Sequence, residues 1–228
     1  MAWGMRNVVI SLFGSSIMEG RVDVENVDDR YYMILQKMLS HRFPEVCFSI
    51  INSSVGGWST RELMKHLDDY VLKYSPDYCV VMFGANNHDH SHPERILAEG
   101  EFERLMDEFE ARLPERCHRI GAVCNPIVDE NHKYVKSKDP VWIEALKPYG
   151  NSLDRLMEPE RESARRFYRE HGYPIVDLGT LMRPDPARYL LAEDGIHHGP
   201  AGHRLFAEAL FQVLEQMIIA NGDDTNGR

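Results

Sequence analysis

Two serines follow the first apolar run of the chain, at a point where a nucleophile could stand. The run VVISLF, residues 8–13, ends at Gly14, and Ser15 and Ser16 come next. A serine at this position either caps the following helix or presents its hydroxyl at the end of a strand. Serine N-caps are common, so the stretch alone leaves both interpretations open. The hydroxyl becomes a useful nucleophile only when a base takes its proton.

A carboxylate and an imidazole near the C-terminus could supply that base. Asp194 and His197 lie three residues apart in AEDGIHHGPAGH, residues 192–203. On a tight turn, the carboxylate can hold Nδ1 of the imidazole and leave Nε2 for Ser16. The adjacent His198 is a rival for the same role, whereas His203 falls at helical spacing in the last helix and is expected to be structural. Together these residues could carry out acyl transfer.

Acyl transfer also needs hydrogen-bond donors for the oxyanion. Gly57, in NSSVGGWST, could offer an unobstructed backbone N–H, and Asn86, in GANNHDH, could offer a side-chain amide. The backbone N–H of Ser16 is a third candidate. Taken alone, Gly57 could equally be a turn glycine, and Asn86 could be an Asx-turn residue.

The elements that must position these residues alternate along the chain. Continuous apolar runs, rather than alternating ones, are typical of a parallel sheet that is covered on both faces. Five such runs occur, at residues 8–13, 46–51, 78–83, 119–124 and 173–178. Segments with helical periodicity lie between and after them, at residues 28–42, 59–74, 99–113, 153–171 and 201–220. This alternation predicts a three-layer α/β/α domain whose ligand lies beyond the carboxyl ends of the strands.

Four blocks in order resemble the SGNH hydrolases, also called GDSL esterases and lipases. The blocks are FGSSIMEG with Ser16, INSSVGGWST with Gly57, FGANN with Asn86, and DGIHHGPAGH with Asp194 and His197. The resemblance covers residues 8 to about 218. It implies a flavodoxin-like SGNH hydrolase fold with a five-stranded parallel sheet.

The same resemblance implies a role for each matched residue. Ser16 would be the nucleophile, and Asp194 and His197 would complete the triad. Ser16, Gly57 and Asn86 would form the oxyanion hole. Motif register favours His197 over the neighbouring histidine. No cofactor and no metal are expected for such a site.

Two positions depart from the family pattern. Its first block usually reads G-D-S, but Ser15 replaces the aspartate here, and its third usually reads G-x-N-D, but Asn87 stands in the last place. Each change removes a carboxylate beside the expected site. The local hydrogen bonding and the substrate preference are therefore the properties most open to change.

Length and composition limit the other possibilities. The 228 residues predict one domain over residues 1–220 and a disordered tail over 221–228. A formal net charge of −10 argues against nucleic acid or an anionic membrane as a partner. No signal peptide or membrane span is recognisable, and the four cysteines form no C-x-x-C pair, so buried reduced thiols and a cytoplasmic location are expected.

Several residues near the expected site have two interpretations. Trp58 is expected to wall the substrate pocket, although it could belong to the core. Trp142 lies in the long loop at residues 125–152, and it is expected at the pocket rim together with Tyr134 and Tyr149; an oligomer contact is the alternative. The run HDHSH, residues 88–92, could bind zinc, but it fits no structural zinc pattern and is expected to be an exposed polar loop.

These observations predict a serine esterase that acts on a small-molecule ester. The expected substrates are short-chain acyl or acetyl esters, carbohydrate acetates among them, and the expected route is an acyl-enzyme. The first alternative is a non-catalytic ligand-binding module on the same fold. The second, less favoured, is a metal-dependent phosphoesterase that uses the HDHSH loop.

Overall fold

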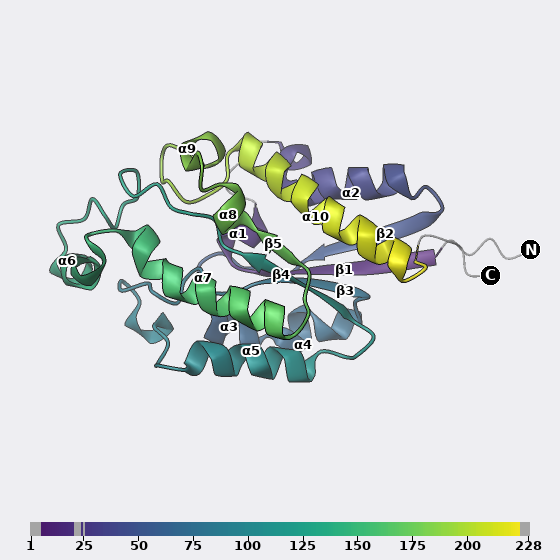
Figure 1. Ribbon diagram of the computed structural model, residues 1–228, viewed down its shortest axis with the longest axis horizontal. Coiled ribbons are helices and arrows are strands. Elements are labelled where there is room, and N and C mark those ends of the chain that lie inside the picture. Colours follow the sequence, from purple (N-terminus) through teal and green to yellow (C-terminus); the bar gives the residue numbers. More distant parts are fainter. Residues whose placement is uncertain (1–5, 21–23, 25, 224–228) are drawn as a thin grey trace, which may run out of the picture.

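The apolar runs form one parallel sheet in the computed structural model, which describes residues 6–20, 24 and 26–223 (Figure 1). The strand order is β2-β1-β3-β4-β5, which is the flavodoxin-like order. The strands are β1 (Arg6–Gly14), β2 (Val46–Asn52), β3 (Tyr78–Met82), β4 (His118–Val123) and β5 (Ile175–Asp177). The predicted strands are therefore confirmed, although β5 is shorter than expected; its last residue, Asp177, caps the helix that follows.

The strand order creates a crevice between β1 and β3. After β1 the chain continues to β2 on one side of this pair, and after β3 it continues to β4 on the other side. The connections that leave the two neighbouring strands therefore run in opposite directions and leave space for a ligand between them. Gly14 at the end of β1 pairs with Met82 at the end of β3, so both strands stop at the same level. Residues that follow β1 and β3 therefore meet at this edge.

Helices cover both faces of the sheet (Figure 1). Because side chains alternate along a strand, Leu12 of β1 packs in one layer and Phe13 in the other. The first layer contains α2 (Tyr31–Arg42) and α10 (Pro200–Ala220). The second contains α3 (Thr60–Lys65), α4 (Leu67–Tyr70), α5 (Glu101–Arg112) and α7 (Leu153–Glu170). The predicted three-layer α/β/α architecture is confirmed.

Short helices occupy the connections. They are α1 (Ser16–Glu19), α6 (Pro140–Leu146), α8 (Leu178–Leu181), α9 (Pro186–Tyr189), and the 3-10 turns η1 (Val27–Asp29), η2 (Leu72–Tyr74), η3 (Pro93–Arg95) and η4 (Lys147–Tyr149). The single helix expected at residues 59–74 is in fact three pieces, broken at His66 and Val71. The ring of His66 stacks on Trp58 and Tyr70 at this break.

The long connection after β4 has a small core of its own. Trp142 and Leu146 of α6 are buried against Leu153, Leu156 and Met157 of α7. This apolar contact gives the connection a defined structure at the carboxyl edge of the sheet. Within the described residues, no helix is both long and apolar enough to cross a membrane.

The cysteines and the C-terminus differ in part from expectation. Cys79, Cys117 and Cys124 are buried free thiols, but Cys47 is exposed on the edge strand β2. Residues 221–223, which are expected to belong to a disordered tail, are instead ordered: Asp223 is buried and accepts a hydrogen bond from the Tyr78 hydroxyl. Residues 224–228 lie outside the described part of the chain.

Candidate active site

Ser16 is the first residue of α1, immediately beyond the end of β1. Its Oγ lies 2.9 Å from Nε2 of His197, within hydrogen-bond distance. Ser15 occupies the N-cap position, makes no capping bond with its side chain, and is buried. The Ser16 hydroxyl thus faces an imidazole rather than a backbone N–H, which rules out its interpretation as a helix cap.

Asp194 holds the other side of the same imidazole. Its Oδ2 lies 2.6 Å from Nδ1 of His197, and its Oδ1 accepts from the backbone N–H groups of Ile196 and His197 at 2.9 and 3.0 Å. Burial raises the pKa of Asp194, but these hydrogen bonds outweigh it and lower the value to about 2. The carboxylate therefore stays ionised at neutral pH beside the imidazole.

A glycine makes this tight turn possible. Gly195 has φ of +69°, and a Cβ there would lie 2.4 Å from the carbonyl oxygen of Val128. The Gly195 carbonyl in turn accepts a hydrogen bond from the Val128 N–H at 2.8 Å. The turn that carries Asp194 and His197 is therefore fastened to the start of the long connection after β4.

The neighbouring histidines have other partners. His198 is buried, and its Nε2 lies 3.1 Å from Oδ1 of Asn125, which also supports the turn that carries Asp194 and His197 through the Ile196 carbonyl. Nδ1 of the buried His203 accepts from the backbone N–H of Tyr31. Neither ring faces Ser16, so the structure brings together Ser16, His197 and Asp194.

The residues expected to bind an oxyanion line one cavity with Ser16. Gly57 has φ of +84°, a left-handed conformation that favours glycine, and its N–H makes no hydrogen bond within the described residues. Asn86 donates one amide hydrogen to the Trp58 carbonyl at 3.0 Å, which orients the side chain and leaves the second hydrogen available. The N–H of Ser16 lies in the first turn of α1, where it has no intrahelical partner.

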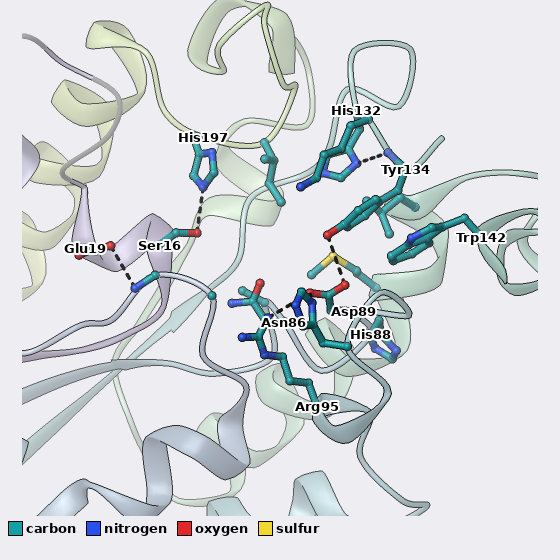
Figure 2. Close-up of a pocket in the computed structure, with 18 residues that line it drawn as sticks. Ser16, Glu19, Asn86, His88, Asp89, Arg95, His132, Tyr134, Trp142 and His197 are labelled. Carbon is teal, nitrogen blue, oxygen red and sulfur yellow. Dashed lines mark hydrogen bonds and ion pairs between the residues drawn. The ribbon is translucent and has the colours of Figure 1, made fainter. Parts of the chain in front are cut away.

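The cavity has a volume of about 450 Å³, large enough for a small organic ligand (Figure 2). Figure 2 shows Ser16 and His197 on one side of it and Tyr134 and Trp142 on the other. Tyr134 stacks on the buried Trp142 with ring centroids 3.8 Å apart. Both aromatics line the cavity, but Trp142 is buried in its wall rather than at the rim, and Tyr149, which is expected beside them, is not among the lining residues.

Comparison with known proteins identifies the family. Residues 12–205 match the GDSL-like lipase/acylhydrolase family. The chain belongs to this family. This GDSL-like protein is therefore an ester-bond hydrolase, as the sequence blocks predict.

Individual relatives agree with the assignment. An acetylxylan esterase from Geobacillus stearothermophilus is 23% identical over 203 residues, which are 88% of each chain. The lipase/acylhydrolase from Enterococcus faecalis has a similar structure, with a TM-score of 0.69 at 19% identity over 92% of this chain and 96% of that one. Axe2, an acetylxylan esterase from Geobacillus stearothermophilus, has a similar structure with a TM-score of 0.65, at 18% identity over 92% of this chain and 95% of that one. The structural likenesses confirm the predicted fold.

One departure of this GDSL-like hydrolase from its family pattern has a structural counterpart. Asn87 is buried; its Oδ1 accepts from the Thr60 N–H at 2.8 Å, and its Nδ2 donates to the Glu160 carboxylate at 3.2 Å. Glu160, on α7, thus brings a carboxylate beside the position where the family usually has an aspartate. The sequence pattern did not reveal this partner, because it lies 73 residues further along the chain.

Two expectations near the hydrolase site are wrong. The ring of Trp58 does not line the cavity but stacks on His66 and Tyr70. Trp58 contributes to the site only through its backbone carbonyl, which accepts a hydrogen bond from the Asn86 side chain. The run at residues 88–92 is an exposed polar loop only at Ser91 and His92, because Asp89 is buried and His88 borders the cavity.

The histidines of this run point to separate partners. His92 binds Asp89 through Nδ1 at 2.8 Å, His88 lies 3.4 Å from Glu160, and His90 packs edge-on against Trp142. In the part of the chain that the structure describes, no group of three or more His, Cys, Asp or Glu side chains is arranged to hold a metal ion. The geometry gives no support to the phosphoesterase alternative.

Three buried histidines of the hydrolase predict sensitivity to acid. Burial lowers the pKa of His198 to about 3, and those of His132 and His203 to about 4. The unfolded chain, with histidine pKa near 6.5, takes up protons first as the pH falls. Each ring should therefore lower the free energy of unfolding as the pH falls from about 6.5 toward its folded pKa, while above pH 6.5 its contribution is fully present.

Urea unfolding at a series of pH values checks this expectation. The midpoint should fall steeply from pH 6.5 to 4.5. Replacing the exposed His41 with glutamine is the matched control and should leave the slope unchanged. A midpoint that stays level over this range would show that the buried rings titrate normally.

Proposed function

We propose that the protein is a serine esterase that hydrolyses short acyl esters, carbohydrate acetates among them, through an acyl-enzyme. The observation that carries the proposal is the continuous contact from Asp194 through His197 to the Ser16 hydroxyl, in the wall of a cavity. The similarity to an acetylxylan esterase supports acetyl groups as substrates.

In the proposed reaction, Nε2 of His197 takes the proton of Ser16 while Oγ bonds to the ester carbonyl carbon. The carbonyl electron pair moves onto its oxygen, where the N–H groups of Ser16 and Gly57 and the Asn86 amide stabilise the charge. His197 then gives its proton to the alcohol oxygen as the C–O bond breaks. Water, deprotonated by His197, attacks the acyl-enzyme, and the acid leaves as Ser16 regains its proton.

The ionised Asp194 has two roles in this cycle. Its bond to Nδ1 keeps the imidazole oriented toward Ser16 and places the exchangeable proton on the correct nitrogen. Its negative charge stabilises the imidazolium that forms when Ser16 loses its proton. The proposed cycle uses no cofactor.

A pre-steady-state assay with p-nitrophenyl acetate tests the proposal. A burst of p-nitrophenol equal to the enzyme concentration should precede steady turnover if an acyl-enzyme accumulates. A serine-directed phosphonate should abolish turnover, and a panel of esters that vary in acyl length and alcohol should then define the preferred substrate. Enzyme that binds the esters without turnover would favour the binding-module alternative.

Asn86 should contribute mainly to the transition state. Its available amide hydrogen meets a charge that exists only when the carbonyl carbon is tetrahedral. We expect Asn86→Ala to lower kcat by about 10²- to 10³-fold with KM nearly unchanged. Asn86→Asp should be no better, because a carboxylate would face the developing oxyanion.

Steady-state kinetics on folded variants checks this expectation. Circular dichroism should first show that each variant is folded, since Asn86 also binds the Trp58 carbonyl. Asn87→Ala provides a neighbouring comparison and should affect kcat less than Asn86→Ala. If Asn86→Ala kept a kcat near that of the wild type, Asn86 would be only a turn residue.

A further inference from the structure

His132 lies in the cavity wall close to the catalytic turn. Its side chain is buried, and its Nδ1 accepts a hydrogen bond from the backbone N–H of Tyr134 at 3.2 Å. A ring nitrogen that accepts carries no proton, so in the neutral ring the proton is on Nε2. No described residue accepts a hydrogen bond from Nε2, which leaves this N–H for a ligand in the cavity. Burial lowers the pKa of His132 to about 4, so the ring is uncharged at neutral pH.

The backbone fixes this donor relative to the nucleophile. The segment that leads to His132 is joined to the catalytic turn by the hydrogen bond from the Val128 N–H to the Gly195 carbonyl. The same turn carries His197, whose Nε2 contacts Ser16. His132 is therefore held at a defined place beside the reacting groups.

Arg95 provides a second donor edge at a different side of the cavity (Figure 2). Its Nη1 donates to Asp89 at 3.2 Å, and its Nε lies 3.4 Å from the Glu62 carboxylate. Its Nη2 makes no hydrogen bond within the described residues. A Cβ at Gly57 would lie 3.9 Å from Nη2, so this edge of the guanidinium lies alongside the glycine of the expected oxyanion hole.

The loop that carries Arg95 is itself held in place. Arg61 of α3 donates to the carbonyls of Glu94 and Ile96, on both sides of Arg95, at 2.5 and 3.2 Å. The same guanidinium forms a two-point contact with Glu101 of α5, at 2.6 and 2.7 Å. These contacts give Arg95 a rigid support, as a recognition residue requires.

The charges around these donors favour a neutral ligand. Two carboxylates, Asp89 and Glu62, offset the charge of Arg95, and His132 is uncharged. The oxygens of Asp89 already accept from His92, Arg95, the Ser91 N–H and the Tyr134 hydroxyl, so this carboxylate organises the wall and is saturated as an acceptor. The exposed Lys133 and the Glu19 carboxylate, which also border the cavity, carry opposite charges.

We propose that His132 and Arg95 recognise the neutral, hydroxylated alcohol portion of the ester, through hydrogen bonds from Nε2 and Nη2 to its oxygen atoms. An acetyl group offers no polar atom beyond the ester itself, so the acceptors must belong to the alcohol. His132 and Arg95 thus determine which alcohol portion the enzyme prefers. This inference rests on the proposed esterase function and assigns part of its substrate recognition.

Paired substrates separate this role from a structural one. One substrate is a monoacetylated methyl pyranoside, and the other is p-nitrophenyl acetate, whose alcohol portion lacks hydroxyl and ring oxygens. His132→Phe and Arg95→Met should each lower kcat/KM for the sugar ester about tenfold more than for the aryl ester, mainly through a higher KM. His132→Gln, which retains an N–H donor, should recover most of the sugar preference.

Two exposed residues provide matched controls. His41→Phe on α2 and Arg104→Met on α5 make the same chemical changes away from the cavity, and both should keep the wild-type ratio between the two substrates. If a cavity variant fails to fold, the wild-type enzyme gives a second measurement. Sugar acetates that lack the hydroxyl next to the ester should then be hydrolysed about tenfold less efficiently than the parent compound.

The outcomes distinguish the two levels of the proposal. Equal losses on both substrates, unchanged ratios, or insensitivity to removal of the hydroxyls would overturn the roles of His132 and Arg95 while leaving the esterase function in place. Wild-type enzyme that hydrolyses neither ester would overturn the esterase function, and the recognition roles with it.

Discussion

Replacing Ser16 with alanine should lower kcat for ester hydrolysis by about 10⁴- to 10⁶-fold, because loss of a triad nucleophile leaves only binding and oxyanion stabilisation. The substitution removes the Oγ that lies 2.9 Å from His197 and leaves the backbone N–H in place. KM should change little, because the hydroxyl forms its new bond only during the reaction. Steady-state kinetics with p-nitrophenyl acetate, on protein shown to be folded, measures the effect.

The adjacent serine provides the matched control. Ser15→Ala removes a buried Oγ that has no hydrogen-bond partner among the described residues, so no polar contact is lost. We expect it to keep a substantial part of the wild-type activity. An active Ser16→Ala variant beside an inactive Ser15→Ala variant would mean that the nucleophile has been assigned to the wrong serine.

His197→Ala should lower kcat by at least about 10³-fold, because Ser16 would lose its proton acceptor and the leaving alcohol its proton donor. His198→Ala should cost far less activity per folded molecule. The His198 ring bonds Asn125 and does not face Ser16, so its loss should appear mainly as lower stability. Active-site titration with a serine-directed phosphonate corrects for any unfolded fraction.

The pH dependence of the wild type gives a separate check on the histidine. Only a neutral imidazole accepts the Ser16 proton, so kcat/KM should rise with increasing pH over the range in which His197 loses its proton. The pKa of Asp194, about 2, places its protonation well below this range. A flat profile from pH 5 to 8, with chemistry rate-limiting, would count against a histidine base.

The fold and the centre of the site were predictable because their signals are local. Each strand is a continuous apolar run, and Ser16 and Asn86 follow two runs that the topology brings to one sheet edge. The spacing of Asp194 and His197 suits a tight turn, which Gly195 permits with its positive φ. In these cases a short stretch of sequence contains the whole physical requirement.

The cavity wall was not predictable in the same way. Trp58 is expected from the sequence to meet the substrate, but its ring stacks on His66 and Tyr70 instead. His132 and Arg95 lie in irregular connections, where no periodicity relates one residue to another. Their positions depend on contacts between distant segments, such as those of Arg61 with the loop around Arg95.

The contact between Asn87 and Glu160 makes these two positions an epistatic pair. An aspartate in place of Asn87, as is usual in the family, would set a second carboxylate against Glu160, and one of the two would have to hold a proton. Asn87→Asp alone is therefore an unfavourable step, whereas Asn87→Asp combined with Glu160→Gln conserves both the charge and the hydrogen bond. A mutational library or an ancestral reconstruction of this protein should vary the two positions together.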